Sequence, residues 1–129
     1  MNTIVRLMLV SVMLIVAAPA FSAQAMQVWK CEMDDDATEE QVLAGAQEWL
    51  NLARKQPGGA GFTASVQFPV AVNAIGEFDV FHVLTAPSFE DWGKFWDSYS
   101  GSPAAAREDE AHEYIICPDS AVWESIPLK

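Results

Sequence analysis

Hydrophobic and polar residues alternate along four stretches of the chain, a pattern typical of strands with two unlike faces. The predicted strands are Met26–Met33, Phe62–Phe68, Phe78–Leu84 and a last strand made of Tyr114–Cys117 with Ala121–Ile126. The last strand is interrupted near Pro118, because proline has no N–H for the ladder of a sheet. The third stretch is apolar on both faces, which favours a central position in a sheet.

Two helices are predicted between these strands. Thr38 and Gln41 form a capping box ahead of apolar residues that recur at helical spacing. Ser88, with Asp91 three residues later, begins a second helix that carries an aromatic stripe. Pro103 starts a short alanine-rich turn of helix that runs to about residue 111. The aromatic residues of the stripe are Phe89, Trp92, Phe95, Trp96 and Tyr99.

The element order β-α-β-β-α-β predicts an α+β, ferredoxin-like fold: a four-stranded antiparallel sheet with two main helices on one face. The helices cover only one face, so the other must meet water, a ligand or a partner. The third predicted strand places Val80 and His82 on one side and Phe81 and Val83 on the other. Since neither side suits water, we expect a homodimer, with the apolar connection 70–75 reaching across.

The first 25 residues have the pattern of an export signal. Arg6 precedes an apolar run of 12 residues, Leu7–Ala18, which is shorter than the roughly 20 that a membrane-spanning helix needs. Ala23 and Ala25 supply small residues for cleavage after Ala25, and Ser22 is a weaker second point. We therefore expect a signal peptide at 1–25 and one domain at 26–129. The localisation would be periplasmic or secreted, without stable membrane insertion after cleavage.

The net charge of −11 argues against some partners. It becomes −12 in the expected mature chain, because Arg6 is the only charged residue of the signal. Such an acidic surface repels nucleic-acid phosphates and anionic lipids, so no nucleic-acid partner is expected. Solubility is a sufficient explanation of the charge.

The chain has two cysteines, Cys31 and Cys117, which lie 86 positions apart. An even count in an exported chain favours a disulfide, worth roughly 4 kcal/mol by loop closure. In the expected topology the last strand lies beside the first, which brings the two cysteines face to face. Two free thiols or a metal pair is the alternative, although neither cysteine has a CxxC spacing or a histidine neighbour.

His82 is the strongest single candidate for chemistry. A histidine among apolar strand neighbours can act as a base or a haem ligand, and it can equally be a structural residue with locally satisfied nitrogens. Phe81, Trp92 and Trp96 are candidates to line a pocket with it for a flat apolar ligand. The helical spacing of the aromatic residues is equally explained by packing in the core, without any ligand.

No metal site is predicted. His112 stands among Glu108, Asp109 and Glu113, a surface that a divalent metal could use, but dense charge runs are usually solvated helix faces. The aspartates 34–36 suit a helix start, and the calcium-loop spacing is absent. No serine or cysteine has the sequence context of a nucleophile, so the catalytic residues are unassigned apart from His82.

The chain resembles the dimeric α/β-barrel superfamily, as an exported bacterial branch. The residues that carry the resemblance are Val28–Cys31, the aromatic helix Phe89–Trp96, and Ile116-Cys117 followed by Val122-Trp123. The resemblance implies ferredoxin-like subunits packed sheet to sheet. The superfamily includes cofactor-independent monooxygenases, chlorite-dismutase-like haem proteins and small binding proteins, and no shared catalytic residue can be carried over.

The expected function is binding of a small, partly apolar molecule in a cavity between the sheet and its cover. One alternative is a cofactor-free or haem-dependent enzyme that uses the same cavity with His82. A second alternative is a protein-interaction module that docks through its spare sheet face. The cofactor is left open by the sequence.

Overall fold

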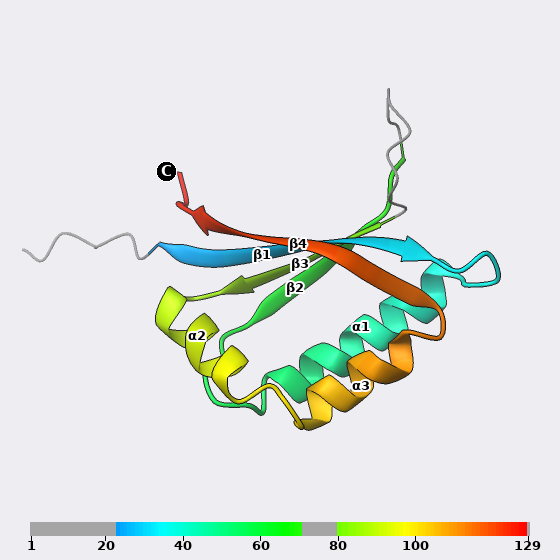
Figure 1. Cartoon of the computed structure of the whole chain (residues 1–129). Helices are drawn as coiled ribbons and strands as arrows, with labels where there is room; N and C mark the ends of the chain where they lie inside the picture. Colours follow the sequence, from blue (N-terminus) through cyan, green and yellow to red (C-terminus); the bar gives the residue numbers. More distant parts are fainter. Residues whose placement is uncertain (1–22, 71–79, 129) are drawn as a thin grey trace, which may run out of the picture.

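A computed structural model describes residues 23–70 and 80–128. The elements are β1 (Gln24–Met33), α1 (Glu39–Ala53), β2 (Thr63–Gln67), β3 (Val80–Ala86), α2 (Phe89–Asp97), α3 (Pro103–Ala111) and β4 (Ile115–Ser125). Figure 1 shows all three helices on one side of the sheet. Residues 71–79, which include most of the apolar connection and Phe78, lie outside the described part.

The four strands form one antiparallel sheet in the order β2-β3-β1-β4. This order is that of a ferredoxin-like fold, as the sequence predicts. β4 is one continuous strand, and the expected interruption is a shift of its register against β1. Lys30 pairs with Asp119 whereas Glu32 pairs with Ile116, so the shift lies opposite Pro118. The missing N–H of proline explains why the ladder slips there.

Side-chain caps begin each helix. Thr38 accepts a hydrogen bond from the Gln41 N–H at 3.2 Å, and Ser88 accepts one from the Asp91 N–H at 3.0 Å. Ser102 does the same for α3, whose first residue is Pro103. This third helix has 9 residues and ends at Ala111, the end expected from the sequence, and a good cap and a run of alanines support it.

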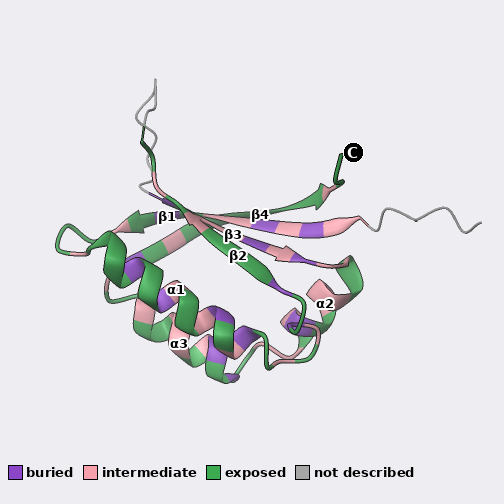
Figure 2. Ribbon diagram, turned by 180° about the vertical axis from the view of Figure 1, so that it is seen from behind, coloured by how far each residue is buried: buried purple, intermediate pink, exposed green. Residues whose placement is uncertain are grey.

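The predicted disulfide between Cys31 and Cys117 is present, with the two Cα atoms 4.0 Å apart. It joins the central strand β1 to the edge strand β4. Figure 2 shows β4 exposed along most of its length, whereas β1 contributes buried residues. The crosslink therefore holds an edge strand that has little core packing of its own.

The buried residues under the helices form two separate clusters. The aromatic cluster lies at the α2 end and consists of Ala25, Leu50, Ala53, Phe62, Leu84, Ala86, Phe95 and Ala104. The disulfide cluster lies at the other end and consists of Cys31, Val42, Val80 and Ile115. Trp29 packs against both clusters.

The second face of the sheet, here called the open face, carries apolar side chains that no described residue covers. Pairing places Met26 in one row with Thr85 and Trp123, and Lys30 in another with Phe81 and Asp119. Trp123 is 57% exposed and Phe81 is 37% exposed. As predicted, β3 carries apolar side chains on both of its faces, with His82 on the helix-covered face and Phe81 on the open face. Among the described residues, no helix has the length and apolarity that a membrane crossing requires.

Candidate functional site

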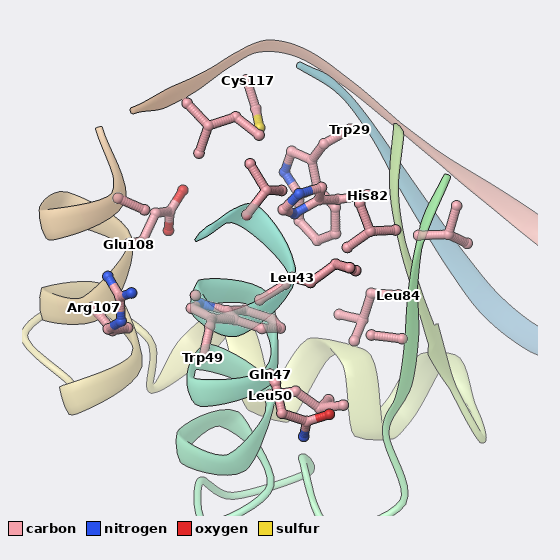
Figure 3. A pocket seen from close by; sticks show the side chains of 18 of the residues that line it. Trp29, Leu43, Gln47, Trp49, Leu50, His82, Leu84, Arg107, Glu108 and Cys117 are labelled. Atoms are coloured by element: carbon pink, nitrogen blue, oxygen red, sulfur yellow. The ribbon is translucent and has the colours of Figure 1, made fainter. Parts of the chain in front are cut away.

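A cavity of about 280 Å³ lies between the sheet and the helices α1 and α3. Figure 3 shows His82 and Trp29 on its sheet wall, Leu43 and Trp49 on α1, and Glu108 on α3. Residues of both buried clusters contribute to its lining. The cavity therefore lies beneath α1 and α3, where the disulfide cluster meets the aromatic cluster.

Small side chains leave this space open. Ala46 of α1, Ala64 of β2 and Ala111 of α3 all line the cavity. Protein interiors are close-packed, so a larger residue at any of these positions would extend into the space. Three alanines from three different elements are an arrangement that keeps a cavity rather than a core.

Gly45 sets how closely α1 approaches the chain that follows α3. A Cβ atom at this glycine would lie 2.0 Å from the hydroxyl oxygen of Tyr114 and 3.0 Å from Arg107. Arg107 donates to that Tyr114 oxygen at 3.1 Å and to Glu48 of α1 at 2.7 Å. The glycine, which weakens a helix, therefore makes room for a polar contact that fixes α3 beside α1.

Three indole rings wall one part of the cavity. The ring centroid of Trp29 lies 6.4 Å from that of Trp49, with 73° between the planes. It lies 6.1 Å from that of Trp96, at 55°. All three residues line the cavity. Edge and tilted contacts of this kind hold aromatic walls in fixed orientations.

His82 faces this cavity from β3, directly across the strand pair from Trp29. Its Nε2 atom is buried and has no hydrogen-bond partner within the described ranges. Burial lowers the pKa of His82 below its ordinary value of 6.5, so the ring is neutral at pH 7. A neutral imidazole has one donor and one acceptor, and it can serve a bound molecule in either capacity.

Trp96 differs from two neighbouring tryptophans in the state of its indole N–H. Trp49 donates to the Tyr99 hydroxyl at 2.9 Å, and Trp92 donates to the Gln27 side chain at 2.9 Å. The Trp96 Nε1 atom is buried and finds no acceptor in the part of the chain that the structure describes. A buried N–H usually has a partner, so the Trp96 N–H marks a position beside the cavity where an acceptor is missing among the described residues.

Glu108 is a polar residue of the helix wall, and it is contacted by Tyr99, which is not among the lining residues. The Tyr99 hydroxyl donates to the Glu108 carboxylate while it accepts from Trp49. Burial, and then the hydrogen bond to Glu108, raise the pKa of Tyr99, which keeps the phenol protonated. Glu108 itself lines the cavity, so the relay places an acceptor carboxylate at the α3 side.

The structure brings together some of the predicted site residues and separates others. His82 and Trp96 both line the cavity. Trp92 packs on Trp96 with 6.5 Å between ring centroids but is not among the lining residues. Phe81 belongs to the open face, because it is adjacent to His82 along a strand and so points to the other side.

Sequence reasoning missed Trp29, Trp49 and Glu108 as lining residues. Trp29 precedes the buried Cys31 by two strand positions, which was a signal for its face of the sheet. Trp49 lay on the predicted apolar stripe of the first helix. Neither signal reveals that the region beneath the helices is hollow.

Metal and haem chemistry find little support in the described residues. No three His, Cys, Asp or Glu side chains within 23–70 and 80–128 are placed to share a metal ion. His82 Nε2 could reach a haem iron, but a haem macrocycle is larger than a cavity of about 280 Å³. The described site therefore does not fit the haem that the resemblance implies for some members.

No protein-family model and no curated protein matches this chain. Among solved structures, it is similar to a dimeric ferredoxin-like protein of unknown function from Thermobifida fusca, with a TM-score of 0.51 and 13% identity over 82% of this chain and 92% of that one. It is also similar to a hydroxynitrile lyase from Passiflora edulis, with a TM-score of 0.51 and 14% identity over 84% of this chain and 96% of that one. Putative chlorite dismutase TA0507 gives 0.51 and 11% over 82% of this chain, which spans only 46% of that protein. These likenesses show the ferredoxin-like fold.

Proposed function

We propose that this protein binds a small, partly apolar molecule in the cavity between its sheet and its helices. The observation that carries the proposal is the pair of buried polar atoms in the cavity lining, His82 Nε2 and Trp96 Nε1, that have no partner in the described chain. Leaving a buried polar atom unpaired costs about 1–3 kcal/mol, and a ligand would remove that cost. The volume of about 280 Å³ is near the lower end of ligand sites.

The assembly that we propose is a homodimer formed through the open face. Phe81, Ile116 and Trp123 are exposed there, and contiguous exposed apolar surface commonly marks an interface. The Thermobifida fusca protein of the same fold is dimeric. Phe81→Asp should give monomers, whereas Phe89→Asp, at an exposed phenylalanine on α2, should leave the dimer intact.

The proposal includes export with removal of the N-terminal signal. Cleavage after Ala25 would take Gln24 and Ala25 from β1, although Ala25 is fully buried and pairs with Ala86. Cleavage after Ser22, the second expected point, would keep β1 whole, and we favour it for that reason. N-terminal sequencing of exported protein should read Ala23 first, and Met26 first would contradict this choice. The disulfide is consistent with an oxidising compartment.

A second candidate function is a cofactor-free enzyme that uses the same cavity. A buried, neutral imidazole can accept a proton from a bound molecule, and the low pKa of His82 keeps it in that basic form. The hydroxynitrile lyase of the same fold shows that a neighbour is an enzyme. His82→Leu would abolish turnover under this reading and would only alter affinity under the binding reading.

Native mass spectrometry of protein purified from its own host tests the main proposal. We expect twice the mature mass plus the mass of two copies of a retained small molecule, one in the cavity of each subunit. Ala46→Leu, which fills the cavity, should lose that molecule and keep the dimer. Ala44→Leu is the matched control, since Ala44 is exposed on the same helix and outside the lining. Ligand retained by Ala46→Leu would place binding elsewhere. A monomer that captures a different chain would favour the interaction module.

A further inference from the structure

The volume of the cavity indicates the size of molecule that its walls can surround. An engineered protein cavity of about 150 Å³ binds a single benzene ring. The cavity described here measures about 280 Å³, close to twice that volume. A molecule with the bulk of two fused six-membered rings would therefore fill it, whereas a single ring would leave much of it empty.

The walls favour a flat molecule. Trp29, Trp49 and Trp96 present three ring surfaces at different angles around the same space. An aromatic ligand can meet one indole face to face and another by its edge, and each such contact adds about 0.5–1.5 kcal/mol beyond its buried area. Aliphatic ligands gain only the area term from these walls.

The charges of the lining favour a neutral molecule. Arg107 is the arginine of the lining, and its guanidinium is already paired with Glu48 at 2.7 Å and with Glu110 at 3.7 Å. Glu108 adds a carboxylate to the wall, in a protein of net charge −11. An anionic ligand would be repelled, because the field of the whole protein has the same sign.

The unpartnered atoms determine which polar group the molecule carries. An indole N–H is only a donor, so Trp96 requires an acceptor such as a carbonyl or ether oxygen. His82 can complement it with either a donor or an acceptor at Nε2. Both side chains border Trp29, which packs 6.1 Å from Trp96 and pairs across the strands with His82.

From these observations we infer that the cavity selects a neutral, flat molecule of two-ring size whose oxygen accepts a hydrogen bond from the Trp96 indole. His82 is the second polar contact. This inference rests on the proposed binding function and names the class of ligand for that same cavity.

The test uses three naphthalenes of matched shape: 2-acetylnaphthalene, 2-isopropylnaphthalene and 2-naphthoate. They are titrated into the ¹⁵N-labelled mature protein, and the tryptophan indole N–H signals are followed by NMR. The chain has five tryptophans, so each signal can be assigned by Trp→Phe substitution. The ketone should shift the Trp96 signal and bind about tenfold more tightly than the hydrocarbon, because one neutral hydrogen bond separates them. The carboxylate should bind more weakly than the ketone.

Two variants separate the hydrogen bond from packing. Trp96→Phe keeps an aromatic ring but removes the N–H. The affinity for the ketone should therefore fall to that for the hydrocarbon, and the affinity for the hydrocarbon should barely change. Trp92→Phe is the matched control, because that indole donates to Gln27 and does not line the cavity. It should leave the tenfold preference intact.

The outcomes distinguish the two proposals. Equal affinity for ketone and hydrocarbon, or equal losses of both in Trp96→Phe, would overturn the ligand class and leave cavity binding standing. Tightest binding by 2-naphthoate would overturn the requirement for a neutral ligand. If none of the three naphthalenes binds, the ligand class is overturned, and the proposed binding function falls with it only if protein from its own host also retains no small molecule that Ala46→Leu loses.

Discussion

The two ends of the helix-covered face share one sheet and yet are built in different ways. At the α2 end, Phe95 is fully buried, with Phe62 at 4.8 Å and Tyr99 at 5.3 Å between ring centroids. The Trp92 indole there donates to Gln27, whereas the indole N–H of Trp96, on the same helix and at the border of the cavity, has no partner among the described residues. Beneath α1 and α3, alanines border an open cavity, and His82 Nε2 likewise lacks a partner within the described residues.

This difference separates the part of the molecule that stabilises the fold from the part that is free to bind. A filled end gains close packing from its buried side chains. A hollow end gives up that stabilisation, and proteins tolerate such a loss where the space has a use. Substitutions at the two ends should therefore have unequal effects on stability and on binding.

The largest effect is expected from Phe95→Ala at the filled end. Removing a fully buried phenylalanine should lower the free energy of unfolding by about 3–5 kcal/mol. Leu43→Ala on the cavity wall should cost under about 1 kcal/mol, since Leu43 is already 48% exposed. Urea unfolding followed by circular dichroism measures both. Equal losses would show that the two ends are packed alike.

Removal of the disulfide comes next. Cys31→Ala with Cys117→Ala should lower the free energy of unfolding by about 2–4 kcal/mol, because the crosslink closes an 86-position separation in the unfolded chain. The loss should fall on the hollow end, whose buried cluster contains Cys31. Amide hydrogen exchange should then speed up in β4 before it does so in α2. Uniform acceleration across both ends would contradict this assignment.

The filled end was largely predictable from the sequence, and the disulfide with it. Capping residues and apolar periodicity gave the element order, and this order placed Cys31 opposite Cys117, where the structure has them. His82 also fell on a defined side of its strand, since side chains alternate there. These features follow from local pattern and topology.

The hollow end was not predictable in the same way. Whether Ala46, Ala64 and Ala111 meet each other or surround a space depends on the distance between helix and sheet, which no periodicity encodes. Phe81 was named with His82 as a candidate lining residue, although the predicted strand already placed the two on opposite faces. The partners of individual indole nitrogens likewise depend on tertiary contacts such as Trp49 with Tyr99.

A smaller effect is expected at His82. His82→Leu removes a buried nitrogen that has no partner among residues 23–70 and 80–128, and it should raise the free energy of unfolding by about 1 kcal/mol at pH 7 in ligand-free protein. The pKa of His82 is lower in the folded state than its ordinary 6.5, so the unfolded chain binds the proton more readily. Wild-type stability should therefore fall as the pH drops from 6.5 toward the folded pKa.

The fall in the free energy of unfolding at low pH should be absent in His82→Leu. The comparison requires that wild type and His82→Leu are both unfolded in urea at a series of pH values from 7 to 5. Parallel curves for wild type and His82→Leu would mean that the ring titrates normally and is not held neutral beside the cavity.

The smallest effect concerns Gly45, where the hollow end is held together. Alanine normally stabilises a helix by about 1 kcal/mol relative to glycine. Here the added Cβ would meet the Tyr114 hydroxyl at 2.0 Å, so Gly45→Ala alone should gain nothing or lose slightly. In a Tyr114→Phe background that oxygen is gone, and the same substitution should recover several tenths of a kcal/mol. A double-mutant cycle in urea measures the coupling, which should be about 0.5–1 kcal/mol for groups in contact. Additive effects would show that α1 and the segment after α3 are not in contact at Gly45, and the hollow end would then lack the support assigned to it.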